Sequence, residues 1–166
     1  MSRGFVKEDD LEHAGTDVPE RPVSAEPNYV TLKGYAFLEQ LAADLTIKQH
    51  DLFLMKDNQA AIQELAIVNR ELRYVVARLK SALITQPNFE AQQVVFGATV
   101  TVEDENEQYY TYQIVGEDEA DIKANKISWV SPLAKALIGL KVNDSAVWKR
   151  PAGDLTLNIT KIYFDK

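Results

Sequence analysis

Cysteine is absent from the 166 residues, and only two histidines are present. Disulfide bonds and thiolate metal sites are therefore excluded, which fits a reducing compartment. His13 and His50 lie far apart in the sequence, in segments of different character, so they predict neither a paired-histidine metal site nor a catalytic triad. No glycine-rich loop that could hold a phosphate group is present. Nothing in the sequence indicates an enzyme that acts on its own.

Long apolar runs are also missing. No run approaches the roughly 18 residues that a membrane-spanning helix needs, and the N-terminus lacks the apolar core of a signal peptide. The sequence therefore predicts a cytoplasmic protein with no membrane partner. Basic residues number 18 against 25 acidic ones, which gives a net charge of −7. That balance argues against general wrapping of a nucleic-acid backbone, which needs clustered Lys and Arg.

Residues 1–30 form the most acidic stretch. They contain seven acidic and three basic side chains, three prolines and few large apolar residues. Such a composition buries too little surface to offset the entropy of ordering. The sequence predicts a flexible tail, with partner binding as the alternative.

Residues 31–83 show apolar positions at alternating steps of three and four, the pattern of a coiled-coil seam. The seam positions of the first half are Gly34, Leu38, Leu41, Leu45, Lys48, Leu52 and Met55. Those of the second half are Ala61, Leu65, Val68, Leu72, Val75, Leu79 and Ala82. The pattern predicts two long helices of nearly equal length.

The two halves match as an antiparallel pair. Leu52 pairs with Leu65, and Leu45 pairs with Leu72, so that the two positions of each pair have a constant sum, as a hairpin requires. The register predicts a tip near residues 57–59, with Asp57 or Asn58 as the N-cap of the second helix.

After residue 83 the heptad pattern stops. Residues 84–91 contain a proline and predict a linker. In residues 92–166 the period changes to two, which predicts β-hairpins. Between the hairpins, Ser131-Pro132 is typical of a helix N-cap, and Gly139 of a helix end. The whole chain is thus predicted to be α+β: a helical hairpin followed by an antiparallel sheet packed by one short helix.

Several longer motifs have a specific resemblance. "VFGATVTVEDE", "YQIVGEDEADIKANKISWVSPLAKALIGLKVND" and "LNITKIYF" follow in this order between Val94 and Phe164. They resemble the C-terminal domain of the bacterial Gre transcript-cleavage and elongation factors. "YVTLKGYAFLEQL" similarly resembles the start of the Gre hairpin. The resemblance covers most of the chain outside the tail.

This resemblance implies an antiparallel coiled coil and an FKBP-like domain. The FKBP-like domain would dock on the rim of the secondary channel of RNA polymerase, and the hairpin would enter the channel. In the family, two acids at the tip help to hold the second magnesium ion of the polymerase, which cleaves its own backtracked RNA. The implied factor is not an enzyme and has no cofactor or metal ion of its own. Its contact with transcribed nucleic acid would be indirect.

At the tip, this sequence departs from the family pattern Asp-x-x-Glu-Asn. The overlay puts Leu54 at the first acid, Asp57 at the second and Asn58 at the asparagine. One carboxylate is therefore missing, and the hairpin is about ten residues shorter than that of the family. We expect weak or no stimulation of cleavage, with Asp57 at most assisting.

The resemblance also places the docking residues. Ser131 and Pro132 match the family loop that contacts the polymerase, although Val130 replaces the polar residue usual there. Trp129 lies just before them in the sequence, and its two possible roles are an interface anchor and a core residue. On the second arm, Arg70 and Arg73, followed by Arg78 and Lys80, suit a path near RNA, and a solvated helix face is the alternative.

The acidic run "GEDEADIK", Gly116 to Lys123, has four carboxylates but lacks the ligand spacing of a calcium loop, so a solvated loop is favoured over a metal site. Two functions stay open at this point. The first is a Gre-like regulator of elongation that binds RNA polymerase. The second is a protein-interaction or chaperone-like module that keeps the FKBP-like fold but no longer acts on the polymerase.

Overall fold

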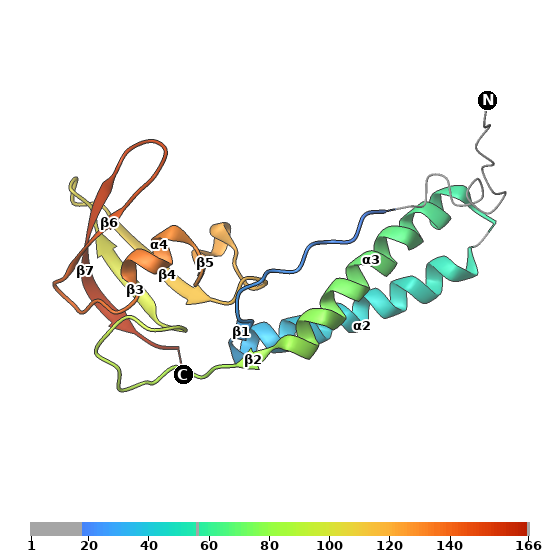
Figure 1. The fold of residues 1–166 in the computed structure, drawn as a ribbon, viewed down its shortest axis with the longest axis horizontal. Helices are drawn as coiled ribbons and strands as arrows, with labels where there is room; N and C mark the ends of the chain where they lie inside the picture. Colours follow the sequence, from blue (N-terminus) through green and yellow to red (C-terminus); the bar gives the residue numbers. More distant parts are fainter. Residues whose placement is uncertain (1–17, 56, 166) are drawn as a thin grey trace, which may run out of the picture. The chain divides into compact units, whose positions relative to one another are not determined.

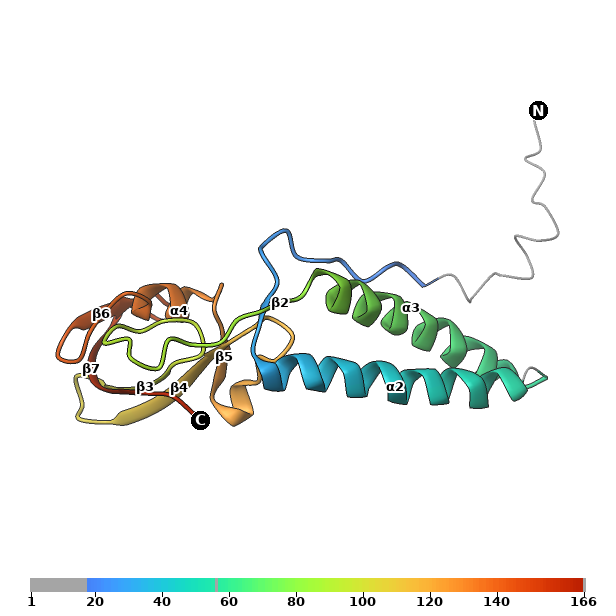
Figure 2. The ribbon, with the colours of Figure 1, turned by 90° about the horizontal axis from the view of Figure 1, so that it is seen from below.

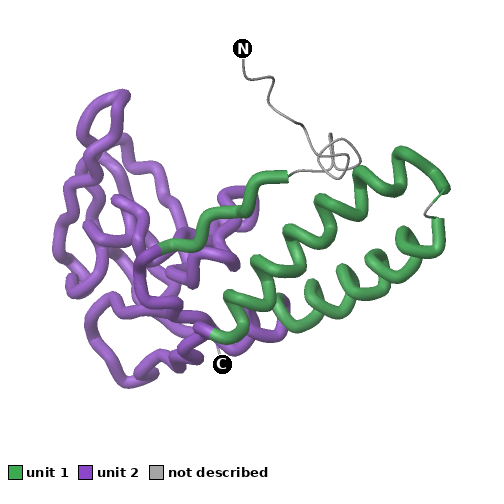
Figure 3. The backbone as a smooth tube through the Cα atoms, turned by 45° about the vertical axis from the view of Figure 1, so that its right-hand side comes forward, with its two compact units in different colours: residues 1–24, 38–80 green, residues 25–37, 81–166 purple. Residues whose placement is uncertain are grey.

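The computed structural model describes residues 18–55 and 57–165. They divide into two compact units, which Figure 3 shows in different colours: residues 18–24 with 38–80, and residues 25–37 with 81–165. Residues 1–17 of the predicted tail lie outside the described residues. Within the described ranges, no helix combines the length and the apolar character that crossing a membrane requires.

Two long helices make up most of the first unit. They are α2 (Leu32–Leu54) and α3 (Gln59–Ser81), each of 23 residues. Figures 1 and 2 both show them side by side with the chain reversing between them. Across this pair the side-chain amide of Gln49 donates a hydrogen bond to Asn69 at 2.6 Å. The structure thus confirms the two long helices that the apolar period predicts.

Six of the fourteen predicted seam positions are buried and six more are half-buried; the buried ones are Gly34, Leu38, Leu52, Ala61, Val68 and Val75. The prediction is wrong at Lys48 and Met55, which are exposed. The ammonium of Lys48 instead binds Glu64 at 2.5 Å, because burying an unpaired charge between helices would be costly. Met55 lies just past the end of α2, in the turn, where no second helix covers it.

The second unit is built on a five-stranded sheet of order β5-β4-β3-β7-β6. Its strands are β3 (Thr99–Glu103), β4 (Tyr109–Val115), β5 (Lys126–Ser128), β6 (Ser145–Trp148) and β7 (Leu155–Tyr163). The predicted hairpins are present, since β3 pairs with β4 and β6 with β7 in antiparallel register. Opposite β3, Thr160 of β7 is an extra residue, and such a bulge bends a strand.

The sheet is mixed, so the prediction of an antiparallel sheet is wrong at one edge. Strand β5 pairs in parallel with β4, with Ile114 opposite Ile127. Parallel neighbours need a crossover connection. Here the crossover is the acidic loop after β4 together with the short 3-10 helix η1 (Ile122–Ala124). A strand of three residues is too short to give a period-two signal.

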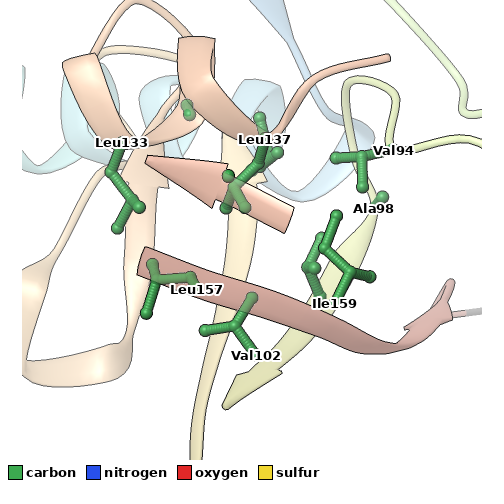
Figure 4. Packing of buried hydrophobic residues seen from close by; sticks show 11 residues of the cluster. Val94, Ala98, Val102, Leu133, Leu137, Leu157 and Ile159 are labelled. Atoms are coloured by element: carbon green, nitrogen blue, oxygen red, sulfur yellow. The ribbon is translucent and has the colours of Figure 1, made fainter. Parts of the chain in front are cut away.

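One short helix, α4 (Pro132–Leu137), packs on the sheet as predicted. Ser131 is its N-cap, and Gly139 follows its end with a φ of +92°, a conformation that favours glycine. In Figure 4, Leu133 and Leu137 of α4 extend toward Leu157 of β7. This buried cluster is the core of the second unit.

Residues 18–30, which the sequence assigns to the flexible tail, form specific contacts instead. Tyr29–Val30 is strand β1, which pairs in parallel with β2 (Leu83–Ile84). The Tyr29 ring meets Trp129 edge-on at 5.0 Å. Composition gives no signal for this strand, because its pairing depends on partners more than 50 residues away. The predicted linker contains no helix or strand from residue 85 to 91.

Candidate functional site

The tip between α2 and α3 has one carboxylate among its three family positions. Leu54 is the last residue of α2 and is 68% exposed, and Asp57 is exposed in the turn. Asn58 caps α3, because its side-chain oxygen accepts hydrogen bonds from the backbone N–H groups of Ala60 (2.9 Å) and Ala61 (3.2 Å). Of the two predicted caps, Asn58 is therefore the correct one.

The end of α2 that leads into the tip is apolar rather than acidic. Phe53, Leu54 and Met55 are consecutive, and each exposes more than half of its side-chain surface. In the described ranges, no group of three or more His, Cys, Asp or Glu side chains could hold a metal ion. The segment between the two helices therefore reverses the chain and exposes apolar side chains, and Asp57 is its single carboxylate.

The predicted docking residues are split between two environments. Ser131 accepts a hydrogen bond from the backbone N–H of Ala134 at 3.2 Å, as an N-cap, and Pro132 is exposed at the first position of α4. Both residues line a cavity of about 450 Å³ in the second unit.

Trp129 and Val130 do not line this cavity. Trp129 continues the pairing of β5, since its backbone N–H donates to the carbonyl of Val115 at 2.9 Å. Its ring packs against Tyr29, and its indole Nε1 is buried without a hydrogen-bond partner among the described residues. The position of Trp129 thus supports the core interpretation over the interface anchor.

The cavity has an apolar wall with an exposed residue at its edge. The apolar and aromatic side chains that line it are Tyr112, Ile122, Ile127, Pro132, Leu133 and Trp148. Ile122, on η1, is 89% exposed. Partial burial raises the pKa of the Tyr112 phenol, with a smaller contribution from Tyr110. This shift favours the neutral phenol, which suits an apolar ligand surface.

The acidic loop before β5 uses its carboxylates in structural bonds. Glu119 accepts a hydrogen bond from the hydroxyl of Thr31 and lies 3.5 Å from the ammonium of Lys126. Asp121 accepts from the backbone N–H of Lys123 at 3.1 Å, as the N-cap of η1. The prediction of a solvated loop is therefore wrong at Glu119, whose side chain is only 9% exposed because it bonds to Thr31 and Lys126.

The arginines of the second arm have acidic partners. Arg70 lies 3.1 Å from Glu71 on α3, and Arg73 binds Glu20 of the N-terminal segment. Arg78, which the sequence groups with the basic residues of this arm, is only 1% exposed. Its burial removes it from any surface, because position 78 falls beside the seam residues Val75 and Leu79. Arg70 and Arg73 stay candidates for contact with an anionic partner.

Sequence reasoning identified only Ser131 and Pro132 among the residues that line the cavity, and those it missed include Tyr112, Ile122 and Trp148. Tyr112 and Trp148 lie on strands β4 and β6, which are not neighbours in the sheet, and no local pattern reveals such a meeting. The sequence did single out Ile122, because it is the one large apolar residue in the acidic run "GEDEADIK". An isolated isoleucine in a charged loop is a candidate contact residue.

Comparison with known proteins places this geometry in context. The family model described as "Transcription elongation factor, GreA/GreB, C-term" matches residues 89–164. Transcription elongation factor GreA of Halorhodospira halophila is 40% identical over 117 residues, which cover 67% of this chain and 74% of the relative. Transcription elongation factor GreB of Neisseria meningitidis serogroup B is 30% identical over 155 residues, covering 84% and 95%. A solved structure, GreA factor homolog 1 (Gfh1) of Thermus thermophilus, aligns with 83% of this chain and 99% of its own at 25% identity and a TM-score of 0.40.

Proposed function

The chain belongs to the GreA/GreB family of transcription elongation factors, and on that premise we propose that it regulates elongation by binding RNA polymerase. The second unit docks on the rim of the secondary channel, and the helical hairpin enters the channel. The protein acts in the cytoplasm as an accessory factor, and any RNA cleavage is carried out by the polymerase.

The cavity beside Ser131 and Pro132 is the observation that supports docking. It lies within the matched residues 89–164 for all of its lining side chains. Concave apolar surfaces with a few polar groups are typical binding sites, and most of the binding energy of an interface comes from a few buried anchors. The exposed Ile122 at its edge is positioned to be buried by a partner. An apolar side chain of the polymerase surface fills the cavity in this proposal.

The hairpin tip supports modulation rather than cleavage stimulation. Asp57 supplies one carboxylate where the family pattern has two, and Leu54 stands in place of the other. A second magnesium ion held by one fewer ligand is bound more weakly. Arg70 and Arg73 on α3 are the proposed contacts near the transcribed RNA, since arginine recognises phosphate in bidentate geometry.

Binding to core RNA polymerase tests the docking proposal directly. The full chain, Ile122→Asp and Val142→Asp are compared by biolayer interferometry on immobilised polymerase. Ile122→Asp places a charge in the interface, so we expect its affinity to fall by at least about tenfold, or about 1.4 kcal/mol. Because Ile122 is 89% exposed, its replacement leaves the fold intact.

Val142→Asp is the matched control, since Val142 is 42% exposed in the same unit but does not line the cavity. It should bind like the natural chain. Equal binding by all three proteins would remove the cavity from the interface. Absence of binding by the natural chain would contradict the docking proposal and favour a protein-interaction module that no longer acts on the polymerase.

A further inference from the structure

A short N-terminal segment, residues 19–22, lies along α3 in Figures 1 and 2. The carboxylate of Glu20 accepts hydrogen bonds from Nε of Arg73 at 3.0 and 3.2 Å and from its Nη2 at 2.5 Å. This is the bidentate geometry in which a guanidinium holds a carboxylate or a phosphate.

The next residue, Arg21, makes two further contacts with the same helix. Its guanidinium lies over the Tyr74 ring, 3.9 Å from the ring centroid, and donates to Glu71 at 2.9 Å. A planar guanidinium on an aromatic face occupies the place that a nucleic-acid base takes when it stacks on tyrosine. Glu20 and Arg21 together therefore imitate the two parts of a nucleotide, the phosphate and the base.

The electrostatics of Glu20 agree with this geometry. The hydrogen bond from Arg73 lowers the pKa of Glu20, and the charges of Arg73 and Arg70 lower it further, against the opposing effect of desolvation. Glu20 thus lies in the field of two arginines. Glu71 is an acidic residue of this surface, and Arg70 at 3.1 Å still offsets its charge when Arg21 leaves.

We propose that residues 19–22 are an autoinhibitory strap, which covers a surface made by Arg70, Arg73 and Tyr74 and leaves it when a single-stranded RNA binds there. This inference rests on the proposed function for the RNA contact of the two arginines, and it adds the regulation of that contact. Phosphates of the strand replace Glu20 at Arg73, and a base replaces Arg21 on Tyr74. The free protein then binds RNA weakly until the strap is displaced.

A double substitution, Glu20→Gln with Arg21→Gln, tests the strap in the full chain. The net charge stays at −7, because one acid and one base are removed together. Binding of a fluorescein-labelled 12-nucleotide RNA is measured by anisotropy at low salt. We expect a roughly two- to fivefold gain in affinity, the range for release of an exposed ion pair. Lys48→Gln with Glu64→Gln is the matched control, because it also removes an exposed ion pair of the hairpin without changing the net charge, and it should leave the affinity unchanged.

Adding Arg73→Gln to the double variant separates the strap from the site beneath it. The gain should disappear, and the dependence of affinity on salt should weaken by about one phosphate contact. If the double variant binds through Arg73 but no more tightly than the natural chain, the strap is refuted and the arginine contact stands. If Arg73→Gln changes nothing, or if no variant binds RNA, the proposed RNA contact fails and the strap fails with it. Docking on the polymerase through the cavity is unaffected by either result.

Discussion

The hydroxyl of Thr31 donates a hydrogen bond to the carboxylate of Glu119, which lies 88 residues later in the sequence. Thr31 is at the same time the N-cap of α2, since its hydroxyl oxygen accepts from the backbone N–H of Gly34 at 2.9 Å. The first turn of α2 contains no acidic residue, so Glu119 supplies the negative charge that a helix N-terminus favours. A Cβ on residue 34 would come within 2.7 Å of Glu119, which explains a glycine inside this helix.

This contact predicts the effect of Glu119→Gln. The amide keeps a hydrogen-bond acceptor for Thr31 but removes the charge that faces both the helix end and Lys126. We expect the free energy of unfolding to fall by about 1 kcal/mol, measured by urea denaturation at neutral pH. Glu90→Gln is the control, because Glu90 is exposed and distant from α2 in the sequence. Equal losses in both variants would contradict a specific role of Glu119.

Leu52 and Leu54 lie two residues apart at the end of α2, yet we expect their substitution by alanine to affect the stability of the helix pair very differently. Leu52 is 8% exposed and packs with Ala61 and Val68 of α3, whereas Leu54 is 68% exposed. Leu52→Ala should therefore destabilise the helix pair by about 2–4 kcal/mol through lost burial and an unfilled cavity. Leu54→Ala should stay within about 0.5 kcal/mol of the natural chain. Thermal unfolding followed by circular dichroism at 222 nm distinguishes the two, and equal effects would disprove the register of the helices.

The turn between β3 and β4 predicts a dependence of stability on pH. The Asp104 carboxylate accepts hydrogen bonds from the backbone N–H groups of Gln108 (3.0 Å) and Asn106 (2.8 Å) and from the hydroxyl of Tyr110 (3.2 Å). The bond from Gln108, followed by those from Asn106 and Tyr110, lowers the pKa of Asp104 against the effect of desolvation. The charged form is therefore the one that the fold favours.

A carboxyl whose pKa is lower in the fold stabilises it above the unfolded pKa of about 3.9, and this contribution is lost as the pH falls through the folded pKa. Asp104→Asn should thus be less stable than the natural chain at pH 6, and the difference should narrow below about pH 4. Denaturant unfolding of both proteins, from pH 6 to below about pH 4, measures this difference in the free energy of unfolding. Glu105→Gln, an exposed neighbour, should show no such narrowing.

Periodicity predicted those parts of the fold whose signals are long and local. The seam of α2 and α3 extends over many turns, so Leu52 and Val68 could be assigned to it from the sequence. The hairpins of β3 with β4 and β6 with β7 are also local. By contrast, β1 and β5 contain two and three residues, too few for any period, and both pair in parallel, β1 with the distant β2 and β5 with the preceding strand β4. The position of β1 depends on a contact more than 50 residues away, and that of β5 on a parallel crossover that no period-two pattern indicates.

The candidate site was predicted only where it overlaps a local motif. Ser131 and Pro132 were found because a helix N-cap and a family loop coincide there. Trp148 and Tyr112 reach the same cavity from strands that are separated in the sheet. Glu20 and Arg73 bind each other although they are 53 residues apart in the sequence. Composition predicts only that such charged side chains lie at the surface, and it does not predict which of them form a pair. Long-range polar contacts were thus the main failure of prediction.

The tip gives the last prediction, which concerns cleavage of backtracked RNA. We expect the natural chain to stimulate cleavage weakly or not at all. Leu54 and Met55 present apolar surface, and Asp57 contributes one charge where the family pattern contributes two. Loss of one ligand to a weakly held magnesium ion should cost at least an order of magnitude in rate, about 1.4 kcal/mol of transition-state stabilisation.

The double variant Leu54→Asp with Asp57→Glu restores the two acidic residue types, yet we expect it to stay poor. Each helix has 23 residues, and an arm about five residues shorter than the family's ends ~7 Å short of the same point. A carboxylate at that distance makes no bond to an ion, because metal–oxygen distances are near 2 Å.

Lengthening both arms of the double variant by matched insertions that keep the apolar period should recover activity. RNA cleavage in stalled, backtracked complexes at equal occupancy is the measurement. Rapid cleavage by the natural chain would show that Leu54 does not occupy the position of a required acid. Rapid cleavage by the double variant without insertions would show that the length of the arms is not limiting.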